Sequence, residues 1–284
     1  MGSQLWRRLK ELGQPVVVTD ANAAAVDALQ REGATTAADP AELAKQCDVV
    51  LLSLPTSAEV EAVALGDAGI ASAAAPGTLV VDLTSGVPSA SRGIAAALAR
   101  AQVRYIDVGV SGGVGGARAG TLKAMAGGDP HDVEDALPLL AQLTSKVWHC
   151  GPVGSGHLVK TLLNQSNQAK LMVELEALMV ASKAGLDPKL VADVLDLPVW
   201  NMWLFGADGR QNAGFTLSLA CKDFDIALRV AAEERVAVPV AAVAQQVLRL
   251  ASGAAGPDAD LVDAVAVWER IAGTQLGTTQ GESS

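Results

Sequence analysis

The sequence predicts an α/β fold in which a parallel-sheet domain is followed by an all-helical domain. Between Pro15 and about Cys150, short strand-like runs alternate with Ala-rich helical stretches, the pattern of stacked βα units. After Gly151-Pro152 no strand-like run recurs, and helical periodicity continues to about Ile271. The apolar half of the chain is mainly Ala, Val and Leu with 3% aromatic residues, which favours helices and buried parallel strands over an antiparallel sandwich.

The first element is a helix that leads into a strand. Leu5, Leu9 and Leu12 recur at i, i+4 and i+7, which indicates one apolar helix face. Gly13 can serve as its C-cap, and Pro15 opens the first strand.

The candidate strands are short apolar runs, each flanked by polar residues or by Gly or Pro. They are Val16–Thr19, Val49–Leu54, Thr78–Leu83, Val103–Ile106 and Val147–His149. Helices are expected between them, for example over Ala23–Arg31 and Ser89–Ala101.

The length also favours two domains, because a single core is near its limit at 284 residues. We expect a sheet domain over residues 1–152, a helical domain over 153–272 and a flexible polar tail over 273–284. The helical domain would be reached through a long helix over Gly156–Ala184. That helix stops at Gly185, and Asp187-Pro188 starts the next one.

The charge balance restricts the possible partners. The chain has 31 acidic and 21 basic residues, a formal charge of −10, and no basic run. Nucleic acid and membrane surfaces are therefore not expected as partners, and a small-molecule ligand is. Three separated cysteines, without a signal peptide or an apolar span, predict a cytoplasmic protein. No His, Cys, Asp or Glu cluster has ligand spacing, so no metal site is predicted.

Asp20 ends the first candidate strand, about eighteen residues beyond Gly2. A dinucleotide-binding fold places there the acid that binds the ribose hydroxyls. The neighbouring Ala21 and Asn22 offer no arginine for a 2′-phosphate, so the pattern favours NAD over NADP. The alternative interpretation is that Asp20 caps the next helix.

Two Gly-rich stretches, Ser111–Gly116 and Gly151–Gly156, are candidate phosphate loops or ordinary turns. Neither has the spacing of a dinucleotide-binding turn, and no Gly-Lys-Ser/Thr follows the first. A run of backbone amides after a strand could instead form a carboxylate-binding nest.

Lys160 is the most informative lysine. It lies inside the long helix among Leu and Val residues, and Asn164 and Asn167 share its face. A desolvated lysine can exchange a proton near neutrality, and a carboxamide one turn away can hold it without adding charge. The alternative is a solvated polar stripe.

Other polar and aromatic residues of this region receive ordinary interpretations. His157 at the helix start has no carboxylate nearby in sequence and would at most support the site. Asp223 and Asp225 are interpreted as helix surface, and Trp200 and Trp203 as core.

Several separated motifs resemble one known family. In the first half they are Asp82–Ser85, Asp107–Gly113, Ala119–Leu122 and Gly127–Asp129, and in the second half Gly154–Gly156 followed by Lys160 and Asn164, then Phe215 with Lys222-Asp223. From Met1 to about Gly273 the chain resembles the β-hydroxyacid dehydrogenases, the 3-hydroxyisobutyrate dehydrogenase-like enzymes related to 6-phosphogluconate dehydrogenase.

The resemblance implies a Rossmann-type NAD(P) domain joined through a long helix to an all-helical domain. It implies hydride transfer between NAD and a small 3-hydroxy carboxylate, or the semialdehyde in reverse. Lys160 would be the general acid/base that takes the hydroxyl proton, and Asn164 would orient it. The family's helical domains pair, which implies a homodimer or homotetramer.

The remaining roles follow from the same motifs. Ser111, Gly112 and Gly113 would bind the substrate carboxylate, with Phe215 and Asp223 closing the site. Leu54, Pro55, Thr84 and Ser85 would line the nicotinamide side of the cofactor, with Lys222 near it.

Three features depart from or refine the family pattern. Gly109 replaces a proline, and Leu163 replaces the first of two adjacent asparagines. The retained Lys160 favours hydroxyacid chemistry over the imine reduction of enzymes with the same fold.

At the N-terminus, the family's Gly-x-Gly-x-Met-Gly turn matches only Met1-Gly2, so Gly2 is the expected pyrophosphate contact. We expect that the chain start has been placed at an internal methionine and that the first strand lies upstream. The alternative is a non-catalytic ligand-binding protein that holds NAD weakly or not at all.

Overall fold

The computed structural model describes residues 1–197 and 214–276, and the chain forms two compact units that divide after Lys160. The division falls inside helix α8 (Ser155–Lys183), eight residues beyond the sequence-based boundary at 152/153. Trp200, Trp203 and the tail from residue 277 lie outside the described residues.

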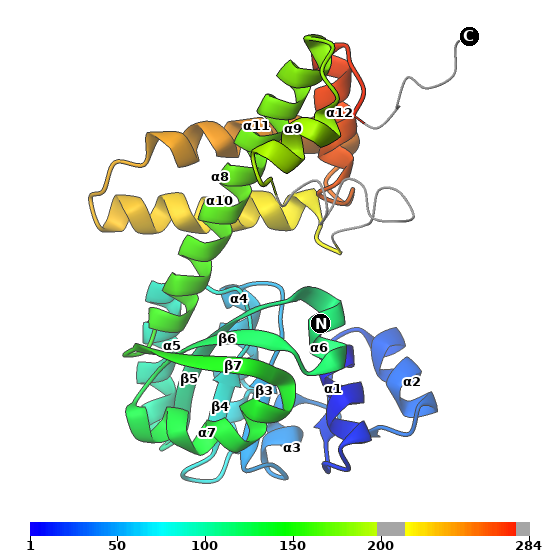
Figure 1. Ribbon diagram of the computed structural model, residues 1–284. Helices are drawn as coiled ribbons and strands as arrows, with labels where there is room; N and C mark the ends of the chain where they lie inside the picture. The colour runs from blue at the N-terminus through cyan, green and yellow to red at the C-terminus, as the bar shows by residue number, and fades with distance from the viewer. Residues whose placement is uncertain (198–213, 277–284) are drawn as a thin grey trace. The chain divides into compact units, whose positions relative to one another are not determined.

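The main sheet of the first unit has the order β3-β4-β5-β6-β7 (Figure 1). Its strands are β3 (Val49–Leu52), β4 (Leu79–Asp82), β5 (Arg104–Ser111), β6 (Leu122–Gly127) and β7 (Thr144–Gly151). Strands β3, β4 and β5 are parallel, as the apolar runs predict. Strand β6, which the sequence analysis did not predict, runs antiparallel to β5, and β7 runs parallel to β6. The sheet is therefore mixed and not wholly parallel.

A second, two-stranded parallel sheet consists of β1 (Val17–Val18) and β2 (Thr35–Thr36). Within residues 1–197 and 214–276, β1 pairs only with β2, and β3 pairs only with β4. The strands of the described residues therefore form two separate sheets.

Side chains alternate between the two faces of the main sheet, and helices cover both faces. Val81, Ile106 and Val108 pack into one core with α1 (Gly2–Glu11), α6 (Gly113–Ala119) and α7 (Pro130–Leu143). Val80 and Tyr105 pack into the other core with α3 (Pro40–Ala44), α4 (Ser57–Leu65), the short 3-10 helix η1 (Ile70–Ser72) and α5 (Pro88–Arg100).

Local capping explains where several of these helices start. Helix α2 (Ala23–Arg31) is capped by Asn22, whose side chain accepts from the amide of Ala24. Asp39, Thr56 and Asp129 cap α3, α4 and α7 in the same way. Each cap satisfies an amide that has no partner inside the helix.

The second unit is helical in its described part. After α8 it contains α9 (Pro188–Val194), α10 (Leu217–Glu233), α11 (Pro239–Ala255) and α12 (Asp263–Ala272). Leu178, Leu217, Phe224 and Leu248 are fully buried in its core. No helix in the described ranges is long and apolar enough to cross a membrane.

Candidate active site

The carboxyl ends of the parallel strands hold the residues predicted to line the nicotinamide. Leu54-Pro55 follows β3 and Thr84-Ser85 follows β4. The amide of Leu54 donates to Oγ1 of Thr84 at 3.2 Å, so the two predicted pairs meet at one edge of the sheet. Parallel strands bring their carboxyl ends to the same edge, which is where ligands of open α/β sheets bind.

The other two predicted cofactor contacts are Gly2, for the pyrophosphate, and Asp20, for the adenosine ribose, and they lie at α1 and after β1. Gly2 opens α1, and a side chain there would contact Ser53, with 3.6 Å between the two Cβ atoms. Asp20 follows β1 and is exposed, and its Oδ1 accepts from the amide of Asn22 at 2.8 Å. The interpretation of Asp20 as the cap of the next helix is wrong, because the side chain of Asn22 caps α2.

Ser111, Gly112 and Gly113 form the turn from the end of β5 into α6. Gly112 and Gly113 have φ angles of 129° and 65°, which side-chain-bearing residues rarely adopt. A Cβ at Gly112 would lie 3.2 Å from a terminal carbon of Leu122, so the turn also packs tightly on β6. The sequence explains the turn because only glycine satisfies both conditions.

The stem of Lys160 lies beside β5. A Cβ built at Gly109 would overlap the Cβ of Lys160 and lie 3.1 Å from its Cγ. Gly109 precedes Ser111 by two residues on the same strand, so the first unit brings Lys160 and the Gly-rich turn to neighbouring points. Gly109, where the family pattern has proline, is therefore a point of close approach between β5 and α8.

Buried acids that the sequence analysis did not assign to the site lie beneath this edge. Asp82 and Asp107 are cross-strand partners on β4 and β5, with 2% and 0% of their surfaces exposed. Oδ1 of Asp82 accepts from the amide of Thr84 at 3.0 Å, and Oδ2 accepts from the Tyr105 hydroxyl at 2.7 Å. An aspartate at the end of an apolar strand must find donors when it is buried, and that signal was available in the sequence.

Asp107 caps the start of α8. Its Oδ1 accepts from the amide of Gly154 at 2.6 Å, and its Oδ2 accepts from the amide of His157 at 2.7 Å. Burial raises the pKa of Asp107, while the charge of His157 and the backbone amides oppose that shift.

His157 is buried and belongs to the same polar cluster. Its Nδ1 lies 2.8 Å from the Ser91 hydroxyl, and its Nε2 donates to the carbonyl of Asp82 at 3.3 Å. This supports the expectation of a supporting group, since its contacts are with structural partners of β4 and α5.

The second unit brings three of its predicted residues together. Nδ2 of Asn164 donates to Oδ2 of Asp223 at 2.5 Å, and Nζ of Lys222 lies 3.4 Å from Oδ1 of Asp223. The interpretation of Asp223 as helix surface is wrong, because only 3% of its surface is exposed. Asp223 lies on the buried face of α10 together with Ala220 and Ala227, three residues before it and four after it. The helical spacing of these residues therefore predicts that Asp223 is buried.

Phe215 lies at the start of α10. Its amide donates to Oδ2 of Asp260 at 3.3 Å, and its carbonyl accepts from the amide of Leu261 at 2.8 Å. Its half-buried ring packs against the core of the helical unit.

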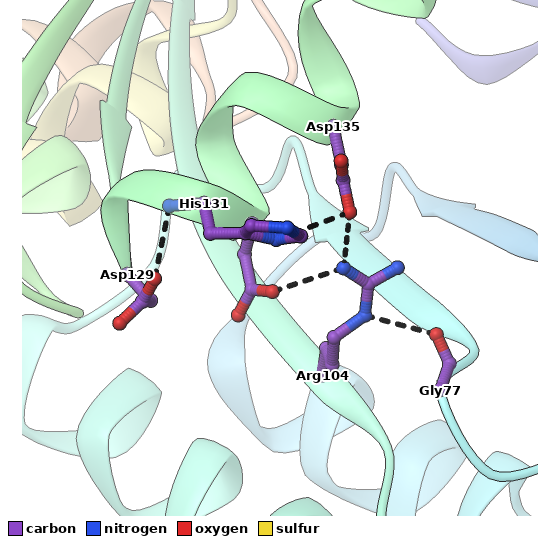
Figure 2. Close-up of polar contacts among 6 residues, drawn as sticks. Gly77, Arg104, Asp129, His131 and Asp135 are labelled. Carbon is purple, nitrogen blue, oxygen red and sulfur yellow. Dashed lines mark hydrogen bonds and ion pairs between the residues drawn. The ribbon is translucent and has the colours of Figure 1, made fainter.

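The amino end of the parallel strands holds a different polar cluster, at the opposite end from Leu54, Thr84 and Ser111. Arg104, at the start of β5, pairs with Asp132 and Asp135 of α7 and donates from Nε to the carbonyl of Gly77 at 2.9 Å (Figure 2). His131 lies 3.4 Å from Asp135. Within the described residues there is no cluster of three or more His, Cys, Asp or Glu that could hold a metal ion.

Comparison with known families agrees with this architecture. Residues 1–151 match the NAD binding domain of 6-phosphogluconate dehydrogenase, and residues 154–268 match the NAD-binding domain of NADP-dependent 3-hydroxyisobutyrate dehydrogenase.

Curated relatives cover most of the chain. The NAD-dependent L-serine dehydrogenase of Pseudomonas aeruginosa is 32% identical over 263 residues, 88% of each chain. A probable mitochondrial 3-hydroxyisobutyrate dehydrogenase of Dictyostelium discoideum is 34% identical over 241 residues, 80% of this chain and 75% of the relative.

Solved structures show the same fold. The Mycobacterium tuberculosis 3-hydroxyisobutyrate dehydrogenase, solved with L-serine, has a TM-score of 0.86 and 26% identity over 94% of this chain and 95% of its own. An imine reductase of Streptomyces aurantiacus, at 18% identity and a TM-score of 0.60 over 94% of this chain and 95% of its own, shares the fold alone. With both halves matched in order, the chain belongs to the β-hydroxyacid dehydrogenase family, the NAD(P)-binding, 3-hydroxyisobutyrate dehydrogenase-like oxidoreductases.

Proposed function

We propose that this protein is an NAD-dependent dehydrogenase of small 3-hydroxy carboxylates in which Lys160 is the general acid/base. The observation that carries the proposal is the contact between the Lys160 stem and Gly109, two residues before Ser111 on β5. Lys160 and the Gly-rich turn would then act on the same small molecule, Lys160 on its hydroxyl group and the turn on its carboxylate.

The carboxylate of the substrate would bind at Ser111, Gly112 and Gly113. Two successive glycines with positive φ angles have a backbone suited to an anion-binding nest, and the hydroxyl of Ser111 precedes them. The substrates in the names of the relatives support this class. L-serine, 3-hydroxyisobutyrate and 2-(hydroxymethyl)glutarate all carry a primary hydroxyl on the carbon next to the one that bears the carboxylate.

The residues at the carboxyl edge fit a nicotinamide cofactor. Leu54, Pro55, Thr84 and Ser85 would line its nicotinamide side. Gly2 would face its pyrophosphate, because α1 begins without a side-chain cap and a helix N-terminus favours anions. Bound there, the cofactor would accept or supply the hydride.

The proton is moved by the protein. In the oxidation direction the hydroxyl proton passes to the neutral Nζ of Lys160, while the electron pair of the C–H bond leaves the same carbon as hydride. The carbon becomes a carbonyl, and Lys160 returns the proton in the reverse reaction. Asn164, held by Asp223 at 2.5 Å, would orient Lys160, with Phe215 and Asp223 closing the site and Lys222 serving the cofactor.

NAD is proposed as the cofactor, with NADP less favoured. Asp20 follows β1 with an exposed carboxylate, which would bind the ribose hydroxyls of NAD and repel the 2′-phosphate of NADP. The NAD-dependent serine dehydrogenase supports this choice, whereas another similar structure, with a TM-score of 0.82, holds NADP+. Equal kcat/KM with the two cofactors would contradict it.

The decisive experiment is Lys160→Ala, assayed by NADH formation with 3-hydroxyisobutyrate, L-serine, glycerate and threonate. General acid/base catalysis contributes about 10²- to 10⁴-fold, so turnover should fall by that amount. Calorimetry should show unchanged NAD binding. Lys170→Ala, an exposed lysine on the same helix, is the matched control and should keep full activity. A Lys160→Ala enzyme with most of its turnover would refute the assignment.

A homodimer or homotetramer is proposed to form through the helical unit. Val240, Val243 and Leu250 make an apolar stripe on α11, with 65% to 68% of each residue exposed. Light scattering should give a multiple of the monomer mass, and Val243→Asp should lower it. A monomeric wild-type protein would contradict the proposal.

A further inference from the structure

The first turns of α8 lie directly on the strands of the sheet, and glycines make this possible. A Cβ at Gly156 would overlap the carbonyl oxygens of Asp107 and Met125. A Cβ at Gly127 would lie 2.6 Å from Oδ1 of Asp107 and 2.7 Å from the amide nitrogen of Gly156. With Gly109 under Lys160, three glycines remove the side chains that would otherwise hold the helix off β5 and β6.

Asp107 attaches this helix start to β5. Its two carboxylate oxygens each accept from one backbone amide at the start of α8, that of Gly154 just before the helix at 2.6 Å and that of His157 in its first turn at 2.7 Å. The other aspartates that cap helices in the described residues, such as Asp129 and Asp187, come from the chain just before their own helix. Asp107 instead comes from a strand 47 and 50 residues earlier. Asp107 therefore connects β5 to the start of α8, whereas an ordinary capping residue only satisfies the end of its own helix.

A further contact restricts rotation of the helix about its axis. His157 reaches Asp82 of β4 and Ser91 of α5 through its two ring nitrogens. Lys160 follows His157 by three residues, less than one helical turn, so a rotation or shift of the first turn moves the lysine with it.

From these contacts we propose that Asp107 is the positioning residue of the catalytic lysine, setting the distance from Lys160 to the substrate turn. Asp107 and Ser111 belong to the same strand, and Asp107 holds the helix that carries Lys160. One carboxylate thus fixes the proton-transfer group relative to the carboxylate-binding turn. This inference rests on the proposed function, because it requires Lys160 to be the acid/base.

The test is Asp107→Asn. The side chain keeps its shape, but its NH2 group faces one of the two helix amides, so one hydrogen bond becomes a repulsive contact. The Gly-rich turn stays on β5 while the start of α8 shifts. We expect kcat to fall by about 10²-fold, the loss that a displacement of about 1 Å can cause. The KM for the hydroxy acid and the affinity for NAD should change by no more than about threefold.

A double mutant separates positioning from general stability. If Asp107 acts through Lys160, Asp107→Asn in the Lys160→Ala background should lower the residual rate by less than about twofold, because the coupled effects do not add. Asp129→Asn, at the exposed cap of α7, is the matched control and should keep wild-type kcat. Full additivity of Asp107→Asn and Lys160→Ala, or an unchanged kcat in Asp107→Asn, would overturn the proposal.

A second variant covers the case in which Asp107→Asn does not fold. Gly109→Ala leaves Asp107 and its hydrogen bonds intact but places a methyl group against the Lys160 stem. We expect the same fall in kcat without a matching rise in KM. Gly93→Ala, where a Cβ meets nothing within 4 Å, is the control. Normal kcat in Gly109→Ala would overturn the proposal, whereas full activity in Lys160→Ala would instead refute the proposed function.

Discussion

The two ends of the main sheet use acidic residues in opposite ways. At the carboxyl end, Asp82 and Asp107 are buried, and each of their oxygens has a specific donor. At the amino end, Asp135 is exposed and shares Arg104 with Asp132 (Figure 2). Buried carboxylates are costly unless every oxygen is satisfied, whereas exposed pairs contribute little. The comparison indicates that the positions of the acidic side chains are fixed at the carboxyl end of the sheet, and that substitutions of acidic residues are better tolerated at the amino end.

The largest effect is expected from Asp107→Ala. It leaves two buried amides at the start of α8, those of Gly154 and His157, without an acceptor, at about 1–3 kcal/mol each, so the free energy of unfolding should fall by about 3 kcal/mol. Urea unfolding measures the change. Asp129→Ala removes one amide contact from an exposed cap and should cost about 1 kcal/mol. Equal losses in the two variants would remove the distinction between a buried and an exposed cap.

An intermediate effect is expected from Tyr105→Phe, which removes the donor to Oδ2 of Asp82 and should cost about 2 kcal/mol. Burial, followed by the charge of Asp82, raises the pKa of Tyr105. A raised pKa means that stability is complete below the ordinary tyrosine value near 10 and decreases as the pH rises above it.

This pH dependence gives an independent measurement. The chain has one tyrosine, so phenolate absorbance reports Tyr105 alone. As the pH rises above about 10, the phenolate absorbance of Tyr105 should appear together with unfolding. The free energy of unfolding of the Tyr105→Phe variant should fall less over the same pH range than that of the wild type. Phenolate formation in the folded protein at pH about 10 would show that Tyr105 is not held by Asp82.

The smallest effect is expected from Asp135→Asn. The hydrogen bond from Arg104 lowers the pKa of Asp135, so the contribution of this acid to stability is present above its ordinary value and is lost as the pH falls through the lower folded value. The difference in urea midpoint between wild type and variant should therefore be small at neutral pH. It should vanish on acidification below pH about 4 and in high salt. A loss as large as that of Tyr105→Phe would contradict the contrast between the two ends.

The sequence predicted the fold best where local pattern and tertiary environment agree. Strand β4 is a continuous apolar run buried on both faces, so its composition alone indicates a central parallel strand, and the apolar run of β3 pairs with it in parallel. Strand β6 was missed because Leu122–Gly127 combines alanine, lysine and glycine, which have low strand propensity. Its pairing with β5 supplies what its own composition lacks.

The same distinction applies to the candidate site. Lys160 and the Gly-rich turn carried recognisable motifs, and the structure brings Lys160 beside the strand that leads to that turn. Asp107 lay inside a motif, yet its role depends on amides about 50 residues later, which no local pattern reveals. Asp223 was interpreted as helix surface because aspartate is usually exposed. The helical period instead places it on the same face as Ala220 and Ala227, which are buried.

The antiparallel strand β6 lies in the long chain segment that separates Asp107 from the amides it binds at the start of α8. The chain must leave β5, run back along it as β6 and cross through α7 to β7 before α8 can start beside Asp107. Until these 47 residues have folded, Asp107 lies on β5 without the amide donors at the start of α8. Non-local contacts of this kind form slowly. We therefore expect the hydrogen bonds between Asp107 and the start of α8 to form late in the folding of the first unit.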